Sequence, residues 1–351
     1  MHLLQPDLAK DFPTLSNFWR KFVAAFKLRF LETNQTQRLP VFNWNLEIQG
    51  VPPTWRQTEG AGVKIAVIDS GADLTHPALQ HLAALTHNRF NAARPDFDPM
   101  AADLNGEEDV MDAAVNGEAH GTYCASVIAA RAVDTAPHGV GGVAPAAEIL
   151  VYKATDADGE STNAYFLKAL KSAIRQNVDL ISVSYVPTGV RAAQRDEIDA
   201  LFRQMAEQGI VMFVALDNTN LLTELNNMRY PATRPEVIPV GVVSPKFMTN
   251  LPASPVFNPA IRWLLPKIPV RYCDLNAAPE GPYIDDLTSA STANACLTGI
   301  AALLISQWKK TEGEAYQRRG KAELMAALSS VAGRFIPAQL LQNPAFQFVQ
   351  P

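Results

Sequence analysis

The chain has 351 residues, of which 48% are hydrophobic and 19% charged, a composition typical of globular proteins with a large core and not of disordered chains. Its net charge of −5 provides no basic field for nucleic acid. No apolar run reaches the roughly 18 residues that a transmembrane helix needs. Nucleic-acid partners and a transmembrane segment are therefore not expected.

The N-terminus lacks the charged region followed by an apolar region that marks a secretory signal peptide. Three widely spaced cysteines predict neither a disulfide framework nor a zinc site. These features predict a cytoplasmic protein. A trimmed piece of a secreted protein is the alternative.

Residues 1–40 are predicted to form an N-terminal extension with an amphipathic helix. Phenylalanine recurs there every four residues, with basic residues between: Phe18, Phe22, Phe26 and Phe30. We expect this helix to dock its aromatic face on the following domain, residues 41–351. The alternatives are a helix for a regulatory partner or a membrane surface, and a short blocking segment.

From about residue 42, apolar β-rich runs alternate with helical patterns. Strands are expected at residues 63–68, 149–154, 180–184, 210–216 and 237–243. Helices are expected at residues 120–131, 163–176 and 192–208. This alternation predicts an α/β fold, a doubly wound and mostly parallel central sheet with helices on both faces. In such sheets, ligands bind at the carboxyl ends of the strands.

The stretch at about 244–286 breaks the alternation with eight prolines. Because proline fixes φ and removes a donor, we expect an atypical insertion, either a long ordered loop or a small appended element. After it, residues 293–305 are apolar almost all round and predict a buried central helix. Residues 322–331 predict one more helix.

Three short motifs contain residue types that catalyse acyl transfer together. Asp69 ends an apolar strand-like run, His120 opens the helical run His-Gly-Thr-Tyr-Cys-Ala, and Ser291 lies in Ser-Ala-Ser-Thr-Ala. A serine hydroxyl is a poor nucleophile unless a base lies within hydrogen-bond reach and an acid orients that base. Histidine suits the base because its ordinary pKa lies near neutrality. The other candidate bases, His76, His81, His87 and His138, have no comparable surroundings.

In this order, and with His76-Pro77 following the aspartate motif, the chain resembles the subtilisin-like serine protease family (subtilases, peptidase family S8). The resemblance covers about residues 42–243 and 287–308. It implies a subtilisin-like fold and a serine endopeptidase with an Asp69-His120-Ser291 triad and an acyl-enzyme on Ser291. It also implies a peptide or protein substrate.

The segment before Ser291 departs from the family, which usually has Gly-Thr-Ser where this chain has Ser289-Ala290-Ser291. Ser289 is therefore a second candidate nucleophile. Only with Ser291 do Ala293 and Gly299 fall on the family's alanine and glycine positions. Ser291 at the start of a helix would also benefit from the positive end of the helix dipole.

The resemblance implies that Asn218, after the strand Val214-Ala215, donates to the oxyanion. Asp217 replaces the family's glycine there, and a loop cap is the alternative role for Asn218. The resemblance also implies that an extended peptide lies between two edges, Ser184-Tyr185-Val186 and Gly159-Glu160. The family often has glycine where Val186 stands, which implies a narrower pocket. Glu160 could favour a basic substrate residue, although a solvated loop carboxylate is the preferred interpretation.

No metal and no cofactor is expected. The acidic residues before His120 fit a solvated loop better than a calcium site, because they lack a calcium-loop spacing: Asp103, Glu107, Glu108, Asp109 and Asp112. Cys124 and Cys296 are expected as small buried hydrophobic residues.

Two other functions fit the same motifs. In one, an amine resolves the acyl-enzyme, which gives a peptide ligase or macrocyclase. In the other, the chain is a catalytically impaired relative that serves as a peptide-binding module. The lost glycine before Asn218 and the lost Gly-Thr before Ser291 motivate the second.

Overall fold

The computed structural model describes residues 54, 56–85, 87–101, 104, 106, 108–112, 119–131, 141–185, 192–216, 230–243, 263–266, 269–275, 283–287 and 289–331. The chain divides into two compact units, Met1–Phe42 and Asn43–Pro351. The first unit lies outside the described residues, so the amphipathic helix and its docking stay predictions.

A parallel sheet of seven strands forms the centre of the second unit, in the order β2-β3-β1-β4-β5-β6-β7. The strands are β1 (Lys64–Asp69), β2 (Arg89–Asn91), β3 (Glu148–Lys153), β4 (Leu180–Val183), β5 (Val211–Ala215), β6 (Val237–Val243) and β7 (Trp263–Pro266). A separate antiparallel pair consists of β8 (Pro269–Cys273) and β9 (Tyr283–Leu287).

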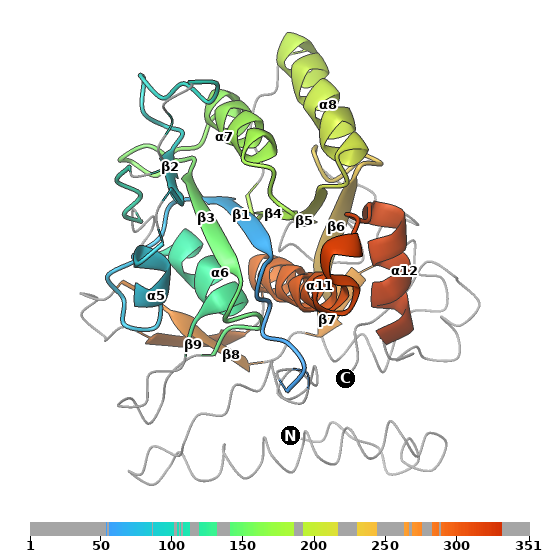
Figure 1. The fold of residues 1–351 in the computed structure, drawn as a ribbon. Coiled ribbons are helices and arrows are strands. Elements are labelled where there is room, and N and C mark those ends of the chain that lie inside the picture. Colours follow the sequence, from blue (N-terminus) through green and yellow to red (C-terminus); the bar gives the residue numbers. More distant parts are fainter. Residues whose placement is uncertain are drawn as a thin grey trace, which may run out of the picture. The chain divides into compact units, whose positions relative to one another are not determined.

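Helices cover both faces of the sheet (Figure 1). Alternate residues of a strand point to opposite faces, and in β1 they divide between two cores. Ile65 and Val67 pack with α6 (His120–Ala129), α11 (Ala290–Glu312) and α12 (Lys321–Val331). Ala66 and Ile68 pack with α7 (Asn163–Arg175) and α8 (Ala192–Glu207). The short helices are α5 (Gln80–Ala83) and the 3₁₀ turn η2 (Gly313–Ala315). The predicted doubly wound α/β fold is confirmed.

The strand order reverses at β1, which pairs with β3 on one side and β4 on the other. In open α/β sheets this reversal is where ligands bind, beyond the carboxyl ends of the strands. Asp69 is the last residue of β1, and Ser184 directly follows β4. The fold thus brings the ends of two predicted site segments to the same position.

Helix α11 runs through the core, and every residue from Ala290 to Leu303 is buried. Its close packing depends on Gly299, where an added Cβ would lie 2.6 Å from the Cβ of Val143. None of the helices in the described ranges, α11 included, combines the length and apolar character needed to cross a membrane.

The proline-rich stretch contains more regular structure than expected. It contains the antiparallel β8–β9 pair, whose Val270, Tyr272 and Cys273 belong to the core, and β7, which extends the main sheet and which the prediction missed. Proline is tolerated at sheet edges, and Pro266 ends this edge strand. Strand β2 and helix α5 were also missed, because three and four residues are too short to show a periodicity.

Substitution of Gly299 by alanine tests how closely α11 packs against Val143. Alanine alone would favour the helix by about 1 kcal/mol. However, the added methyl would overlap Val143, whose N–H is anchored to the Val127 carbonyl. We expect a net loss of about 1–3 kcal/mol in the free energy of unfolding, measured by urea denaturation.

The matched control is Gly320→Ala, because the nearest atom to that added Cβ is a carboxylate oxygen of Glu323 at 3.7 Å. Gly320 directly precedes α12, and alanine is a poorer N-cap than glycine, so a loss of up to about 1 kcal/mol is expected from capping alone. A Gly299→Ala protein as stable as the wild type would show that the helix is not held by this contact.

Candidate active site

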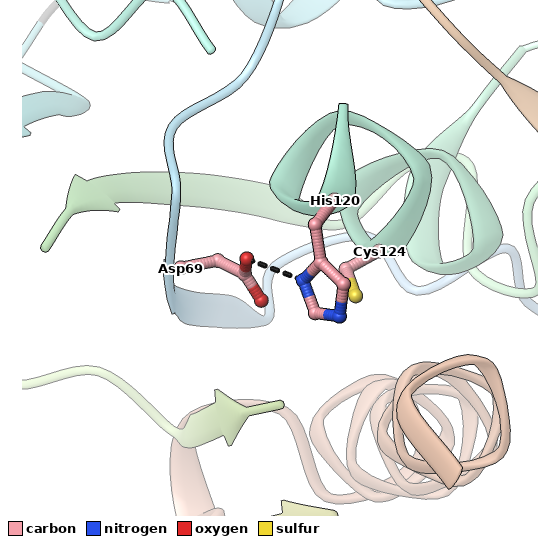
Figure 2. A group of neighbouring side chains, drawn as sticks. All are labelled: Asp69, His120 and Cys124. Carbon is pink, nitrogen blue, oxygen red and sulfur yellow. Dashed lines mark hydrogen bonds and ion pairs between the residues drawn. The ribbon is translucent and has the colours of Figure 1, made fainter. Parts of the chain in front are cut away.

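The carboxylate of Asp69 is buried at the end of β1, with 2% of the residue exposed. Its Oδ1 accepts a hydrogen bond from the N–H of Ser70 (2.8 Å) and lies 2.6 Å from Nδ1 of His120 (Figure 2). Its Oδ2 has no hydrogen-bond partner among the described residues. A carboxylate accepts only, so Nδ1 of the neutral imidazole carries the hydrogen and Nε2 is left to accept one.

The imidazole of His120 connects Asp69 to Ser291. Its Nε2 lies 3.0 Å from Oγ of Ser291, while its Nδ1 contacts Asp69. The ring of Tyr123 meets the imidazole edge-on, with centroids 4.5 Å apart. The acid, base and hydroxyl come from β1, α6 and α11, so the fold joins three segments that are distant in the sequence.

Helix α6, which begins at His120, is capped from outside its own sequence. Ala119 at the N-cap makes no side-chain cap. Instead Oδ2 of Asp112 accepts from the N–H (2.7 Å) and the hydroxyl (2.6 Å) of Thr122, and the Gly121 N–H donates to Oγ of Ser70 (2.8 Å). These bonds satisfy N–H groups that a helix start leaves unpaired and fix the place of His120.

Glycine is required where α6 meets the loop after β1. A Cβ at Gly121 would lie 2.1 Å from the carbonyl oxygen of Gly71, and Gly71 itself has φ +120°. Only glycine allows so close an approach and that backbone conformation. The glycines of the two motifs therefore bring Asp69 and His120 together.

Ser289 and Ser291 have different positions at the start of α11. Ser289 is the N-cap, and its Oγ accepts from the Thr292 N–H (3.2 Å) in a capping box. Ser291 is the second helical residue, and its hydroxyl faces His120. The structure thus places Ser291, and not Ser289, in contact with the histidine.

Ser291 also contacts the end of β4. Its Oγ lies 3.4 Å from the carbonyl oxygen of Ser184, and the hydroxyl of Ser184 lies 3.5 Å from the carbonyl oxygen of Ser291. The Ser291 hydroxyl has one hydrogen, and the shorter of its two possible acceptor contacts is to His120.

Not all of the remaining predicted site residues lie near Ser291 in the part of the chain that the structure describes. Asn218 and Val186 lie outside the described residues. Ser184 faces Ser291, whereas the ring of Tyr185 points to the other side of the sheet and meets Phe166 of α7 edge-on, with centroids 6.2 Å apart. Of the two described residues of this segment, Ser184 is thus the one whose side chain reaches Ser291.

Gly159 and Glu160 belong to a turn that is closed on itself. Oδ1 of Asp156 accepts from the N–H groups of Asp158 (3.1 Å) and Glu160 (2.9 Å), and Gly159 has φ +77°. Thr155 and Ser161 form an antiparallel bridge at its base. The side chain of Glu160 is exposed.

The interpretation of the acidic stretch as solvated is wrong for two of its members. Asp112 is buried and binds Thr122, and burial raises its pKa despite those hydrogen bonds. Glu108 accepts from the Asn91 N–H and pairs with Arg94 at 3.3 Å. Asp109 is exposed as expected, and Asp103 and Glu107 lie outside the described residues.

One group in the described part of the chain has the spacing of metal ligands, namely Asp69, His120 and Cys124, whose candidate atoms lie within 4.8 Å of one another (Figure 2). Burial, with the charge of Asp69, raises the pKa of the Cys124 thiol well above its ordinary value. A protonated thiol is a poor metal ligand. Cys124 and Cys296 are buried, as predicted.

The family model of the subtilases matches residues 60–329, well over half of the chain. The chain belongs to the subtilase family. The three contacting residues occur in the same order along the sequence as the aspartate, histidine and serine of subtilisin.

Similar proteins include an "Intracellular serine protease" of Paenibacillus polymyxa, 31% identical over 60% of this chain and 58% of the relative. "Subtilisin E" of Bacillus subtilis is 29% identical over 71% of this chain and 56% of the relative. The "Major intracellular serine protease" of Bacillus subtilis is 28% identical over 81% of this chain and 80% of the relative. The chain thus spans somewhat more than half the length of the first two.

Sequence reasoning missed two residues that shape the site of this subtilase. Asp112 was read with its acidic neighbours, although its place between apolar residues and the histidine motif is a weak signal of burial. Asn294, on α11, is fully buried and contacts β4. A polar residue inside an otherwise apolar helix was the available signal.

Replacing Asp112 by alanine should shift α6 and His120, because two buried donors of Thr122 lose their acceptor. An unsatisfied buried group costs about 1–3 kcal/mol. We expect a comparable loss in the free energy of unfolding, and a lower kcat with a peptide substrate. Asp112→Asn keeps an oxygen acceptor and should lose less. Equal losses would show that the negative charge, and not the hydrogen bonding, holds the helix.

The pH dependence of stability reports the charge of Asp112 separately. Because burial raises its pKa above the ordinary 3.8, the folded chain binds this proton more readily than the unfolded chain. The free energy of unfolding of the wild type, relative to Asp112→Asn, should therefore fall as pH rises from below 3.8 through the raised pKa. Urea denaturation at a series of acidic pH values measures it, and a constant difference would contradict the raised pKa.

Proposed function

We propose that this chain is a serine endopeptidase that cleaves peptide bonds through an acyl-enzyme on Ser291. The observation that carries the proposal is the unbroken contact from Asp69 through His120 to Ser291, with 2.6 Å and 3.0 Å between the polar atoms. Both distances are within hydrogen-bond reach, as a nucleophile, its base and the orienting acid require. Membership of the subtilase family supports the same reaction.

In the first half of the reaction, Oγ of Ser291 attacks the substrate carbonyl carbon while Nε2 of His120 takes the hydroxyl proton. The tetrahedral intermediate then collapses, the C–N bond breaks, and His120 gives the proton to the leaving amine. Asp69 stays ionised, holds the imidazole in the tautomer with hydrogen on Nδ1, and stabilises the imidazolium.

In the second half, a water molecule replaces the amine. The oxygen of the water attacks the acyl carbon while His120 takes one of the water's protons. His120 then returns a proton to Oγ of Ser291 as the ester bond breaks. The products are the new carboxyl end of the peptide and the regenerated hydroxyl. The cycle consumes water and needs no cofactor.

The negative oxygen of the intermediate needs donors in place before it forms. Ser291 is the second residue of α11, where backbone N–H groups have no partner within the helix and the dipole is positive. We propose the Ser291 N–H and the Asn218 side chain as the donors. Loss of one such donor typically costs about 2.7–4 kcal/mol of transition-state stabilisation.

The proposed substrate is an extended peptide that adds a strand between two backbone segments. One is Ser184 to Val186, beyond the end of β4, and the other is the turn at Gly159 and Glu160. Main-chain hydrogen bonds would give affinity, while side-chain pockets would give specificity. The location of Ser184 beside Ser291 supports the first segment.

We propose a cytoplasmic location and a peptide or protein substrate, with residues 1–40 as a docking or regulatory segment. Two relatives are named as intracellular serine proteases, which supports the location. Deletion of residues 1–40 with unchanged activity would count against a regulatory role for that segment.

Two serine-to-alanine variants, two residues apart, test the nucleophile. Ser291→Ala should abolish labelling by a fluorophosphonate and lower peptidase activity at least about 10³-fold, because the attacking oxygen is gone. Ser289→Ala should keep labelling, and its loss of a helix cap should cost about 1 kcal/mol of stability. Mass spectrometry of the labelled peptide and urea denaturation measure the two outcomes.

The same experiment distinguishes the other functions. Labelling that persists in Ser291→Ala and disappears in Ser289→Ala would identify Ser289 as the nucleophile. A wild-type chain that no phosphonate labels would favour the peptide-binding module. Labelling together with products joined to an added amine, and few hydrolysed products, would favour a ligase or macrocyclase.

A further inference from the structure

Asn294 lies on α11, about one turn after Ser291, and is fully buried. Its Nδ2 lies 3.0 Å from Oγ of Ser182, 3.2 Å from the carbonyl oxygen of Val183 and 3.3 Å from Oγ of Ser184. These three acceptors are consecutive residues at the carboxyl end of β4. The side-chain amide of Asn294 therefore links the helix that holds the nucleophile to the end of this strand.

The orientation of this amide follows from its partners. The carbonyl of Val183 can only accept, so Nδ2 must be the atom that faces the strand. The amide has two hydrogens for three acceptors, and its Oδ1 has no hydrogen-bond partner among the described residues. An unpartnered buried oxygen destabilises the core, so the donor half of the amide is the part with a role here.

Asn294 contacts β4 at the point where the pairing of this strand with β1 and β5 ends. In the register of β4, the last paired residue is Val183, which lies opposite Ile68 of β1 and Val214 of β5. Ser184 follows this pair and has no partner in either ladder. The hydroxyl of Ser184 instead contacts Asn294 and the carbonyl oxygen of Ser291.

We infer that Asn294 is a positioning residue for the substrate. It holds the chain at Ser184 at a fixed distance from Ser291, so that a peptide lying along Ser184 to Val186 presents its carbonyl carbon to Oγ of Ser291. The inference rests on the proposed function, which supplies the substrate strand. The residue acts through Ser184 and does not touch the reacting atoms.

Asn294→Leu tests this role, because leucine has a similar volume and no donor. With an extended peptide substrate, kcat/KM should fall at least about tenfold, mainly through KM, because a displaced Ser184 segment binds the peptide strand more weakly. Labelling by a small alkyl fluorophosphonate does not need the substrate strand, so its rate should stay within about twofold of the wild type.

Thr298→Val is the matched control. Thr298 is one turn further along α11 and equally buried, and its hydroxyl donates to the Asn294 carbonyl within the helix (2.8 Å). The exchange also removes a buried polar group at nearly constant volume, but the hydrogen bond that it removes lies within α11 and not between α11 and β4. Its kcat/KM for peptide cleavage and its rate of phosphonate labelling should both remain within about twofold of the wild type.

A binding measurement separates this inference from the proposed chemistry. In the Ser291→Ala protein, which cannot form an acyl-enzyme, the Kd of a fluorescent peptide is read by anisotropy. Adding Asn294→Leu should weaken binding about tenfold, which is about 1.4 kcal/mol, whereas adding Thr298→Val should not. This comparison holds even if the wild type neither cleaves peptides nor reacts with the phosphonate.

Three results would overturn the inference. One is unchanged peptide cleavage and binding in Asn294→Leu. Another is a parallel fall in cleavage and labelling, which would place the effect on Ser291 itself or on the whole fold. The third is that the Ser291→Ala protein binds no peptide. If Asn294→Leu does not fold, Asn294→Ser keeps one donor and should show a smaller loss, again mainly in KM.

Discussion

The burial of helix α11 on all sides from Ala290 to Leu303 is the constraint on which the structure depends. A helix without a polar face is stable only when other elements cover its whole surface, so the sheet, α6 and α12 are arranged around it. Gly299 sets how closely it can pack against Val143. Because the helix cannot shift without opening the core, its N-terminus is a rigid support for Ser291.

Three buried polar side chains that hold parts of the site form hydrogen bonds through one of their two polar ends only, among the described residues. Asp69 and Asp112 use one carboxylate oxygen and Asn294 uses its amide nitrogen, while the second carboxylate oxygen of each aspartate and Oδ1 of Asn294 have no hydrogen-bond partner in the described ranges. The satisfied atoms all hold parts of the site: the imidazole, the start of α6 and the end of β4. Stability is thus reduced locally where positioning is needed.

Much of this architecture follows from the sequence because buried parallel strands are nearly continuous apolar runs. Strands β1, β3, β4, β5 and β6 and helices α6, α7 and α8 lie within a few residues of their predicted ranges. The edge strands were harder, since β2 is short and β7 ends in proline. Local sequence also could not show that Asp112 caps a helix from outside it, because the contact depends on how a loop folds back.

The choice between Ser289 and Ser291 shows the same limit. The residues after Ser291 favoured it, but only the capping box explains why the preceding serine is present. A serine in place of the family's glycine therefore has a local structural purpose, and this departure from the motif by itself does not imply a lost activity.

The separation of the three contacting residues along the chain has a consequence for protein synthesis. Asp69 and His120 are 51 positions apart, and Ser291 follows His120 by 171. A ribosome therefore completes most of the chain before the nucleophile exists. During that time the growing polypeptide cannot cleave itself or its neighbours through this hydroxyl. Peptidase activity would begin only after α11 has packed against the completed sheet.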